Sequence, residues 1–160
     1  MMMPLRVLAV IAAAILAVSA DAQTAAEGPA PPSYRPGLGD LMTTTVQPRH
    51  TKLAFAGRRK NWAYAAYELH ELDEAFDRLA AQWPQWQRVR IAELVETMIR
   101  EPIDDLGQAI GEKNDSRFAA AYAKLTDACN ACHQAANRPF VVIQEPKESM
   151  FPDQDFGAKP

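Results

Sequence analysis

The sequence predicts an all-α fold, an antiparallel four-helix bundle. Four stretches between residues 37 and 139 carry apolar residues at alternating spacings of three and four, which is typical of helices that bury one face. The links between these stretches are short, so neighbouring helices are expected to run in opposite directions. A chain of 160 residues with 48% hydrophobic content is long enough for one domain with a sizeable core.

The first 22 residues are expected to be a secretory signal peptide. A weakly basic start precedes the apolar run 7–18, and Ala20 or Ala22 ends a small-residue cleavage site. This run of about twelve residues is shorter than the roughly twenty that a membrane span needs. Residues 23–36, rich in Ala, Pro, Gly and Ser, are expected to form a disordered leader.

The first helix is predicted over residues 38–56, with Pro48 kinking it and Gly57 ending it. The second is predicted over residues 61–82, with Asn61 as its N-cap. Its apolar seam consists of Trp62, Ala65, Ala66, Leu69, Leu72, Phe76, Leu79 and Trp83. The opposite face is predicted to be exposed, with His70 free or paired to Glu74. That face carries Glu68, His70, Glu71, Asp73, Glu74 and Asp77.

The third helix is predicted over residues 87–111, with Pro102 kinking it or splitting it in two. The fourth is predicted over residues 116–137, capped by Asp115 and ended by the next proline. Residues 140–160 are expected to form an extended strap packed over the bundle, followed by a tail. That tail is expected to be ordered only where its aromatic residues find a groove.

A Cys-x-x-Cys-His motif lies near the end of the fourth helix. Cys129, Cys132 and His133 form it, and the chain has no other cysteine. This spacing is the signature of covalent c-type haem attachment, in which two thiols add to the haem vinyl groups and the imidazole becomes an iron ligand. On a helix the two cysteines share one face, and His133 lies one turn beyond Cys129. The motif therefore predicts one haem c per chain.

Other interpretations of the two cysteines fit less well. A disulfide between residues three apart would close a tiny loop and constrain the unfolded chain little. A thioredoxin-type redox pair needs strand and helix alternation, which the sequence lacks. Zinc would need two further ligands, so His50 or His70 would have to converge on the motif from other helices.

A signal peptide, four amphipathic helices and this motif near the end of the fourth together resemble the class II c-type cytochromes, the cytochrome c′ and cytochrome c556 group. The resemblance covers residues 38–137 in architecture, whereas Cys129, Cys132 and His133 carry the specific identity. It implies thioether links at both cysteines and His133 as the proximal iron ligand. It also implies haem attachment outside the inner membrane, which agrees with export to the periplasm.

The second axial position of the iron separates an electron carrier from a gas binder. With the first helix antiparallel to the fourth, the level of His133 matches Leu41 or Met42, and His50 lies roughly 12 Å deeper. Met42 is therefore the candidate distal ligand, a role that a methionine of the first helix fills in the c556 group. Ordinary core packing of Met42 stays open. So do His50 as a ligand or as a buried, hydrogen-bonded histidine, and Met98 as a third candidate ligand.

These features predict a periplasmic monohaem cytochrome that transfers one electron at a time to redox partner proteins. The alternative is a five-coordinate haem protein that binds or buffers nitric oxide or carbon monoxide. No enzyme activity is expected, because no catalytic acid, base or nucleophile can be placed near the haem motif. The net charge of −3 gives no reason to expect nucleic acid or an anionic membrane as a partner. No stable membrane insertion is expected after processing, and a homodimer is left open.

Overall fold

Helices make up the regular structure of the chain. The computed structural model describes residues 34–158, which contain no strand beyond a single β-bridge between Trp86 and Val89. The elements are α1 (Leu38–Leu41), the π-helical turn η1 (Met42–Val46), α2 (Gln47–Arg58), α3 (Trp62–Gln82), α4 (Ile91–Leu94), the π-helical turn η2 (Val95–Ile99), α5 (Arg100–Gly111) and α6 (Asp115–Ala135). The all-α prediction is confirmed. The signal peptide predicted for residues 1–22 and the leader up to residue 33 lie outside the described residues.

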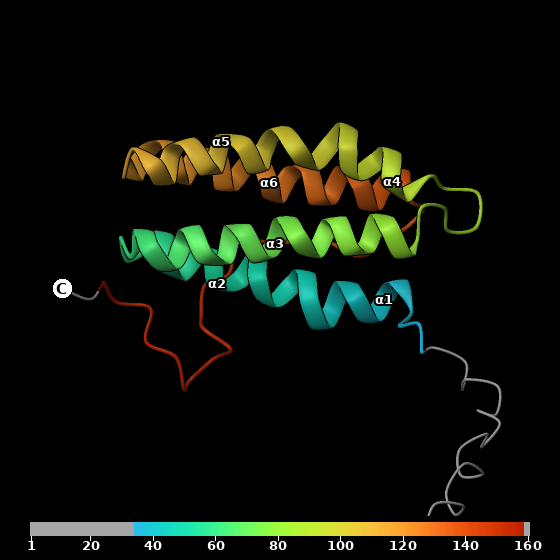
Figure 1. Ribbon diagram of the computed structural model, residues 1–160. Helices are drawn as coiled ribbons and strands as arrows, with labels where there is room; N and C mark the ends of the chain where they lie inside the picture. The colour runs from blue at the N-terminus through green and yellow to red at the C-terminus, as the bar shows by residue number, and fades with distance from the viewer. Residues whose placement is uncertain (1–33, 159–160) are drawn as a thin grey trace, which may run out of the picture. The chain divides into compact units, whose positions relative to one another are not determined.

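The elements form four rods, because α1, η1 and α2 follow one another without a break, as do α4, η2 and α5. α2 packs against α3 and α6, and α5 packs against the same two helices, so the rods close into a bundle (Figure 1). The links 59–61, 83–90 and 112–114 are short, and successive rods run in opposite directions. Among the described residues, none of these helices combines the length and the apolar character that crossing a membrane requires.

The two prolines inside the rods come directly after the wide π-helical turns. Pro48 is the second residue of α2 and follows η1, and Pro102 is the third residue of α5 and follows η2. A proline ring lacks an N–H and clashes with the carbonyl four residues earlier, and a wider turn moves that carbonyl away. Each predicted interruption is therefore present as a local widening, and neither rod is split.

The structure corrects two helix starts. The third rod begins at Ile91 rather than at Gln87, because Gln87 takes a left-handed φ of 55° inside a tight turn. The fourth begins at Asp115, and its cap is Asn114, whose side-chain oxygen accepts a backbone hydrogen bond. Asn61 caps α3 in the same way, as predicted.

The acidic face predicted for the second helix is not uniformly exposed. Glu68 is only 1% exposed and accepts a hydrogen bond from Arg49 of α2 at 3.1 Å, and Arg49 also pairs with Glu71 at 3.0 Å. The prediction is wrong for Glu68 because the periodicity of one helix does not show which partner the neighbouring helix supplies. His70 is exposed and lies 3.3 Å from Glu74, which is one of the two predicted alternatives.

The last residues of the predicted leader are held against the bundle. The Arg35 guanidinium lies 3.7 Å from the centre of the Trp83 ring, and the indole N–H donates to the Pro36 carbonyl at 3.1 Å. The compact helical unit therefore includes the chain from Arg35 onward.

Aromatic side chains, Phe156 above all, hold the C-terminal tail on the bundle. Phe156 is buried, and its ring stacks on the Tyr64 ring with centroids 5.5 Å apart. The Tyr64 hydroxyl also donates to the side chain of Gln154 at 2.7 Å. Phe156 is therefore an aromatic contact between the tail and the bundle, of the kind that the sequence predicts.

Gly57 is a point of close approach between α2 and α6. The sequence predicts that Gly57 ends the first helix, but α2 continues to Arg58, and Gly57 is buried against the Phe118 ring. A Cβ atom added at this position would overlap the ring of Phe118, which is itself buried in the core. The absence of a side chain is therefore needed here for packing rather than for ending the helix.

Gly57→Ala is expected to lower the free energy of unfolding by about 1–3 kcal/mol, the usual cost of overpacking a core. The better helix propensity of alanine, about 1 kcal/mol, acts in the opposite direction. Urea unfolding measures the difference, with Gly39→Ala as the control, because a Cβ at Gly39 meets nothing within 4 Å. Stability equal to that of the control variant would contradict the close approach.

Candidate functional site

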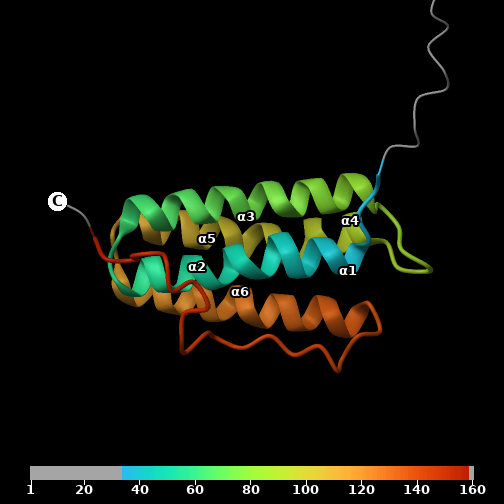
Figure 2. The same ribbon diagram turned by 90° about the horizontal axis from the view of Figure 1, so that it is seen from below.

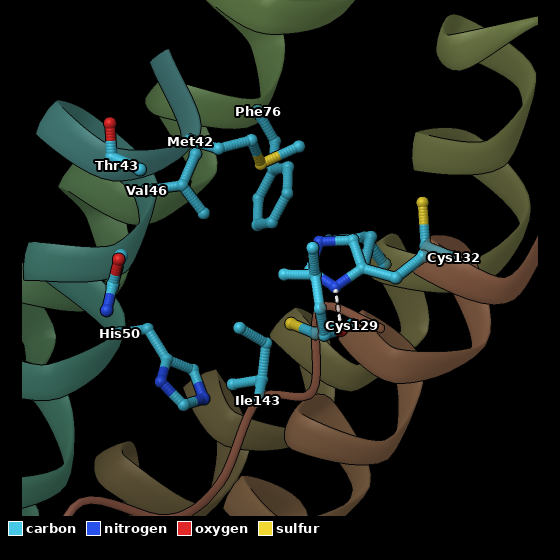
Figure 3. A pocket seen from close by; sticks show the side chains of 12 residues that line it. Met42, Thr43, Val46, His50, Phe76, Cys129, Cys132 and Ile143 are labelled. Carbon is cyan, nitrogen blue, oxygen red and sulfur yellow. Dashed lines mark hydrogen bonds between the residues drawn. The ribbon is translucent and has the colours of Figure 1, made fainter. Parts of the chain in front are cut away.

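One cavity brings together the residues that the sequence singles out. It lies between the first rod, α6 and the strap, which we define as residues 140–146, and it holds about 620 Å³ of space free of protein atoms, part of it open to solvent. Its lining is mostly apolar and consists of Met42, Thr43, Val46, Gln47, His50, Phe76, Ile99, Cys129, Cys132, His133, Val141 and Ile143 (Figure 3). The three motif residues and two of the three candidate distal ligands, Met42 and His50, therefore line one cavity.

Cys129 and Cys132 are free thiols on the part of α6 that lines the cavity. Burial, with a smaller contribution from the nearby Cys132, raises the pKa of Cys129 to about 12. Burial also raises the pKa of Cys132. Both side chains are therefore protonated at neutral pH, a state in which thiols take little part in disulfide exchange.

His133 is held in one tautomer by the strap. Its Nδ1 atom lies 2.9 Å from the carbonyl oxygen of Val141. Because a carbonyl can only accept a hydrogen bond, Nδ1 carries the proton, and the lone pair of the neutral ring is on Nε2. Histidines that bind a metal usually have this arrangement, with the second ring nitrogen donating to a carbonyl or carboxylate.

The chain reverses direction immediately after His133. α6 ends at Ala135 rather than at residue 137, because Asn137 takes a left-handed φ of 58°. The Arg138 amide donates to the His133 carbonyl at 2.7 Å, and the Asn137 amide donates to the Gln134 carbonyl at 3.1 Å. This is a Schellman cap, and it sends the strap back alongside α6 (Figure 2). Val141 and Ile143 of the strap line the cavity.

His50 is buried at the end of the cavity away from Met42, and both of its ring nitrogens are hydrogen-bonded (Figure 3). The Thr126 hydroxyl donates to the Tyr122 carbonyl at 3.0 Å, so it accepts from His50 Nε2–H at 3.1 Å. The Tyr122 hydroxyl lies 2.9 Å from His50 Nδ1 and 2.8 Å from the His50 carbonyl. Burial and, to a smaller extent, the charge of Arg58 lower the pKa of His50 to about 4. This matches the interpretation of His50 as a buried, hydrogen-bonded neutral histidine.

Met42 lies in η1 and extends its thioether into the space between the first rod and α6 (Figure 3). Phe76 lies beside it and comes from α3. The level estimate from the sequence puts Met42 near the motif, and in the structure both line the same cavity. Met98 does not line this cavity, whereas the next residue, Ile99, does.

The donor set suits a covalently attached haem better than a chelated ion. Within residues 34–158, no three His, Cys, Asp or Glu side chains are gathered in a way that could hold a metal ion. A structural zinc site needs four converging ligands. A haem would take the imidazole of His133 as its proximal iron ligand, and the two cysteines would bind its periphery. The residues present therefore fit a haem with an apolar surrounding.

Two parts of the site are missing from the sequence prediction. Tyr122 and Thr126 lie four residues apart on one helix face, a spacing visible in the sequence, but their partner His50 comes from a different rod. The Val141 carbonyl is a backbone atom, and no residue type marks it. A weak signal is the short apolar run 140–143, which predicts an extended strap but not its contacts.

Comparison of this chain with protein-family models, with curated proteins and with solved structures finds no match. The function is therefore inferred from the residues of the cavity.

Proposed function

We propose that the chain is an exported c-type cytochrome that carries one haem c and exchanges single electrons with redox partner proteins. The observation that supports this most is that Cys129, Cys132 and His133 line one apolar cavity. The two thiols supply the attachment points, and His133 Nε2 supplies the proximal ligand. When bound, the haem supplies a one-electron redox centre. The signal peptide expected at residues 1–22 supports a periplasmic location.

Met42 is the distal ligand in this proposal. Its thioether shares the cavity with His133, whereas both ring nitrogens of His50 already have partners. A thioether ligand raises the reduction potential relative to a second imidazole. Val46 and Phe76 are apolar residues of the same lining, and an apolar surrounding also affects the potential.

The proposal is tested on the full chain produced in a host that attaches haem to Cys-x-x-Cys-His motifs. Mass spectrometry of the purified mature protein is expected to give the mass of the processed polypeptide plus one haem. Its absorption spectrum is expected to be that of low-spin, six-coordinate iron in both oxidation states. The bare polypeptide mass with two free thiols would overturn the proposal.

Met42→Ala is expected to convert the iron to a high-spin, five-coordinate form that binds carbon monoxide when reduced. The reason is that alanine offers no donor atom, and the lining of the cavity is mostly apolar. Met98→Ala is the control, because Met98 does not line the cavity. Absorption spectra of both variants with and without carbon monoxide make the comparison. A Met42→Ala spectrum identical to the wild type would exclude Met42 as a ligand.

A second function is favoured by the apolar lining beside Met42, formed by Val46, Phe76 and Ile99. If Met42 does not bind the iron, this side is a dry pocket suited to a small uncharged gas such as nitric oxide or carbon monoxide. Rapid uptake of carbon monoxide by the reduced wild-type protein would support gas binding. Refusal of carbon monoxide would support electron transfer.

A further inference from the structure

A side chain inside the Cys-x-x-Cys-His motif binds the strap to α6 through two hydrogen bonds. Asn130 is the first of the two residues between the cysteines. Its Nδ2 atom donates to the Ile143 carbonyl at 3.0 Å, and its Oδ1 atom accepts from the Ile143 amide at 2.7 Å. One side chain therefore satisfies both backbone groups of a residue in an extended segment.

This pair of hydrogen bonds fixes the register of the strap. In an extended chain, successive side chains point to opposite sides. Val141 and Ile143 line the cavity, whereas Val142 between them is 63% exposed. A slip by one residue would exchange the inward and outward side chains and move the Val141 carbonyl out of position.

The Val141 carbonyl is the group to which His133 Nδ1 donates, at 2.9 Å. Asn130 and His133 are three residues apart on α6 and so lie on the same face of the helix. The two contacts hold strap residues 141 and 143 against one stretch of α6. The strap residue that Asn130 holds is therefore only two positions from the strap residue that binds His133.

The other anchors of the strap lie at its ends. At the start, the Schellman cap reverses the chain, and the Arg138 guanidinium lies 4.6 Å from the centre of the Trp86 ring. At the end, Arg58 of α2 pairs with Glu145 at 2.8 Å. The Val141 amide also donates to the Arg138 carbonyl at 2.9 Å, so this turn holds the start of the strap, and Asn130 holds residue 143.

We propose that Asn130 is a positioning residue, which holds the strap in the register where the Val141 carbonyl orients His133 and tunes the bound haem. The redox part of this inference rests on the proposed function. A carbonyl that accepts from Nδ1 makes the imidazole a more basic ligand. A more basic ligand favours the oxidised, more positively charged iron. Loss of the two Asn130 hydrogen bonds is therefore expected to raise the reduction potential.

The experiment compares Asn130→Ala and Asn130→Asp with Gln134→Ala, an exposed position on the same helix. Two quantities are measured on the haem-loaded protein: hydrogen exchange of the strap peptide, and the midpoint potential by spectroscopic titration. In Asn130→Ala, strap exchange is expected to be at least roughly tenfold faster, because two hydrogen bonds are lost. Its potential is expected to rise. Asn130→Asp keeps the acceptor but loses the donor, so both effects are expected to be intermediate. Gln134→Ala is expected to match the wild type.

If hydrogen exchange of the strap peptide were equally fast in Asn130→Ala and in Gln134→Ala, the inference that Asn130 holds the strap would be overturned. Faster exchange with an unchanged potential would overturn the tuning role. If Asn130→Ala does not fold, Asn130→Asp decides by the same two measurements. A wild-type chain without covalent haem would overturn the proposed function instead, and strap exchange in that chain would still decide whether Asn130 holds the strap.

Discussion

The double variant Cys129→Ala with Cys132→Ala is expected to lack the covalent haem proposed above and to unfold at a much lower temperature than the haem-loaded protein. The cavity is lined mostly by apolar side chains and is partly open to solvent. Protein interiors are otherwise close-packed, and walls that face a void lose their dispersion contacts. Truncating a single large core side chain costs about 2–5 kcal/mol. The loss of a whole porphyrin is therefore large against a total stability of about 5–15 kcal/mol.

Circular dichroism during thermal unfolding and mass spectrometry test this expectation. The control is the wild-type sequence produced without haem-attachment machinery, which keeps both thiols but carries no haem. It is expected to melt at the same low temperature as the double variant, because the missing haem rather than the missing sulfur atoms causes the effect. A cooperative melt at the temperature of the mature protein, with equal helix content, would refute it.

The four rods could be predicted from the sequence because each is long and carries apolar residues at spacings of three and four. Asn61 could be predicted as a cap because capping depends on residues within one turn. The start at Ile91 could not, since it follows from the left-handed conformation of Gln87, a residue type that does not mark such a position. The burial of Glu68 could not either, because its partner Arg49 belongs to another rod.

The same distinction holds for the site. Cys129, Cys132 and His133 are adjacent in sequence, so their common location follows from one helix. The position of Met42 near the motif could be predicted, because counting residues along antiparallel rods shows which residues lie at the same level. The contact between His133 and Val141 depends on a backbone carbonyl placed by the turn at Asn137, and no residue pattern reports such a contact. Haem attachment itself remains a prediction from the motif.

Arg49→Met is expected to destabilise the bundle by about 3 kcal/mol, since removal of one partner leaves a buried charge uncompensated. Glu68 is 1% exposed, and the Arg49 guanidinium lies 3.1 Å from it, whereas the Arg49 side chain is 25% exposed. The partial exposure of Arg49 places the expected value at the lower end of the range for buried pairs, about 3–5 kcal/mol. Urea unfolding of the haem-loaded variant measures the loss.

The matched control is Arg78→Met, which breaks the surface pair of Arg78 with Glu74 at 2.9 Å. An exposed pair of this kind contributes about 0–1 kcal/mol, so the control is expected to stay close to the wild type. Adding Glu68→Leu to Arg49→Met removes the carboxylate that has lost its partner. This double variant is expected to recover most of the stability, because replacing a buried ion pair with apolar residues is often neutral. If Arg49→Met and Arg78→Met lost equal stability, the buried Glu68 side chain would not depend on Arg49. The pair would then behave as a surface contact despite its burial.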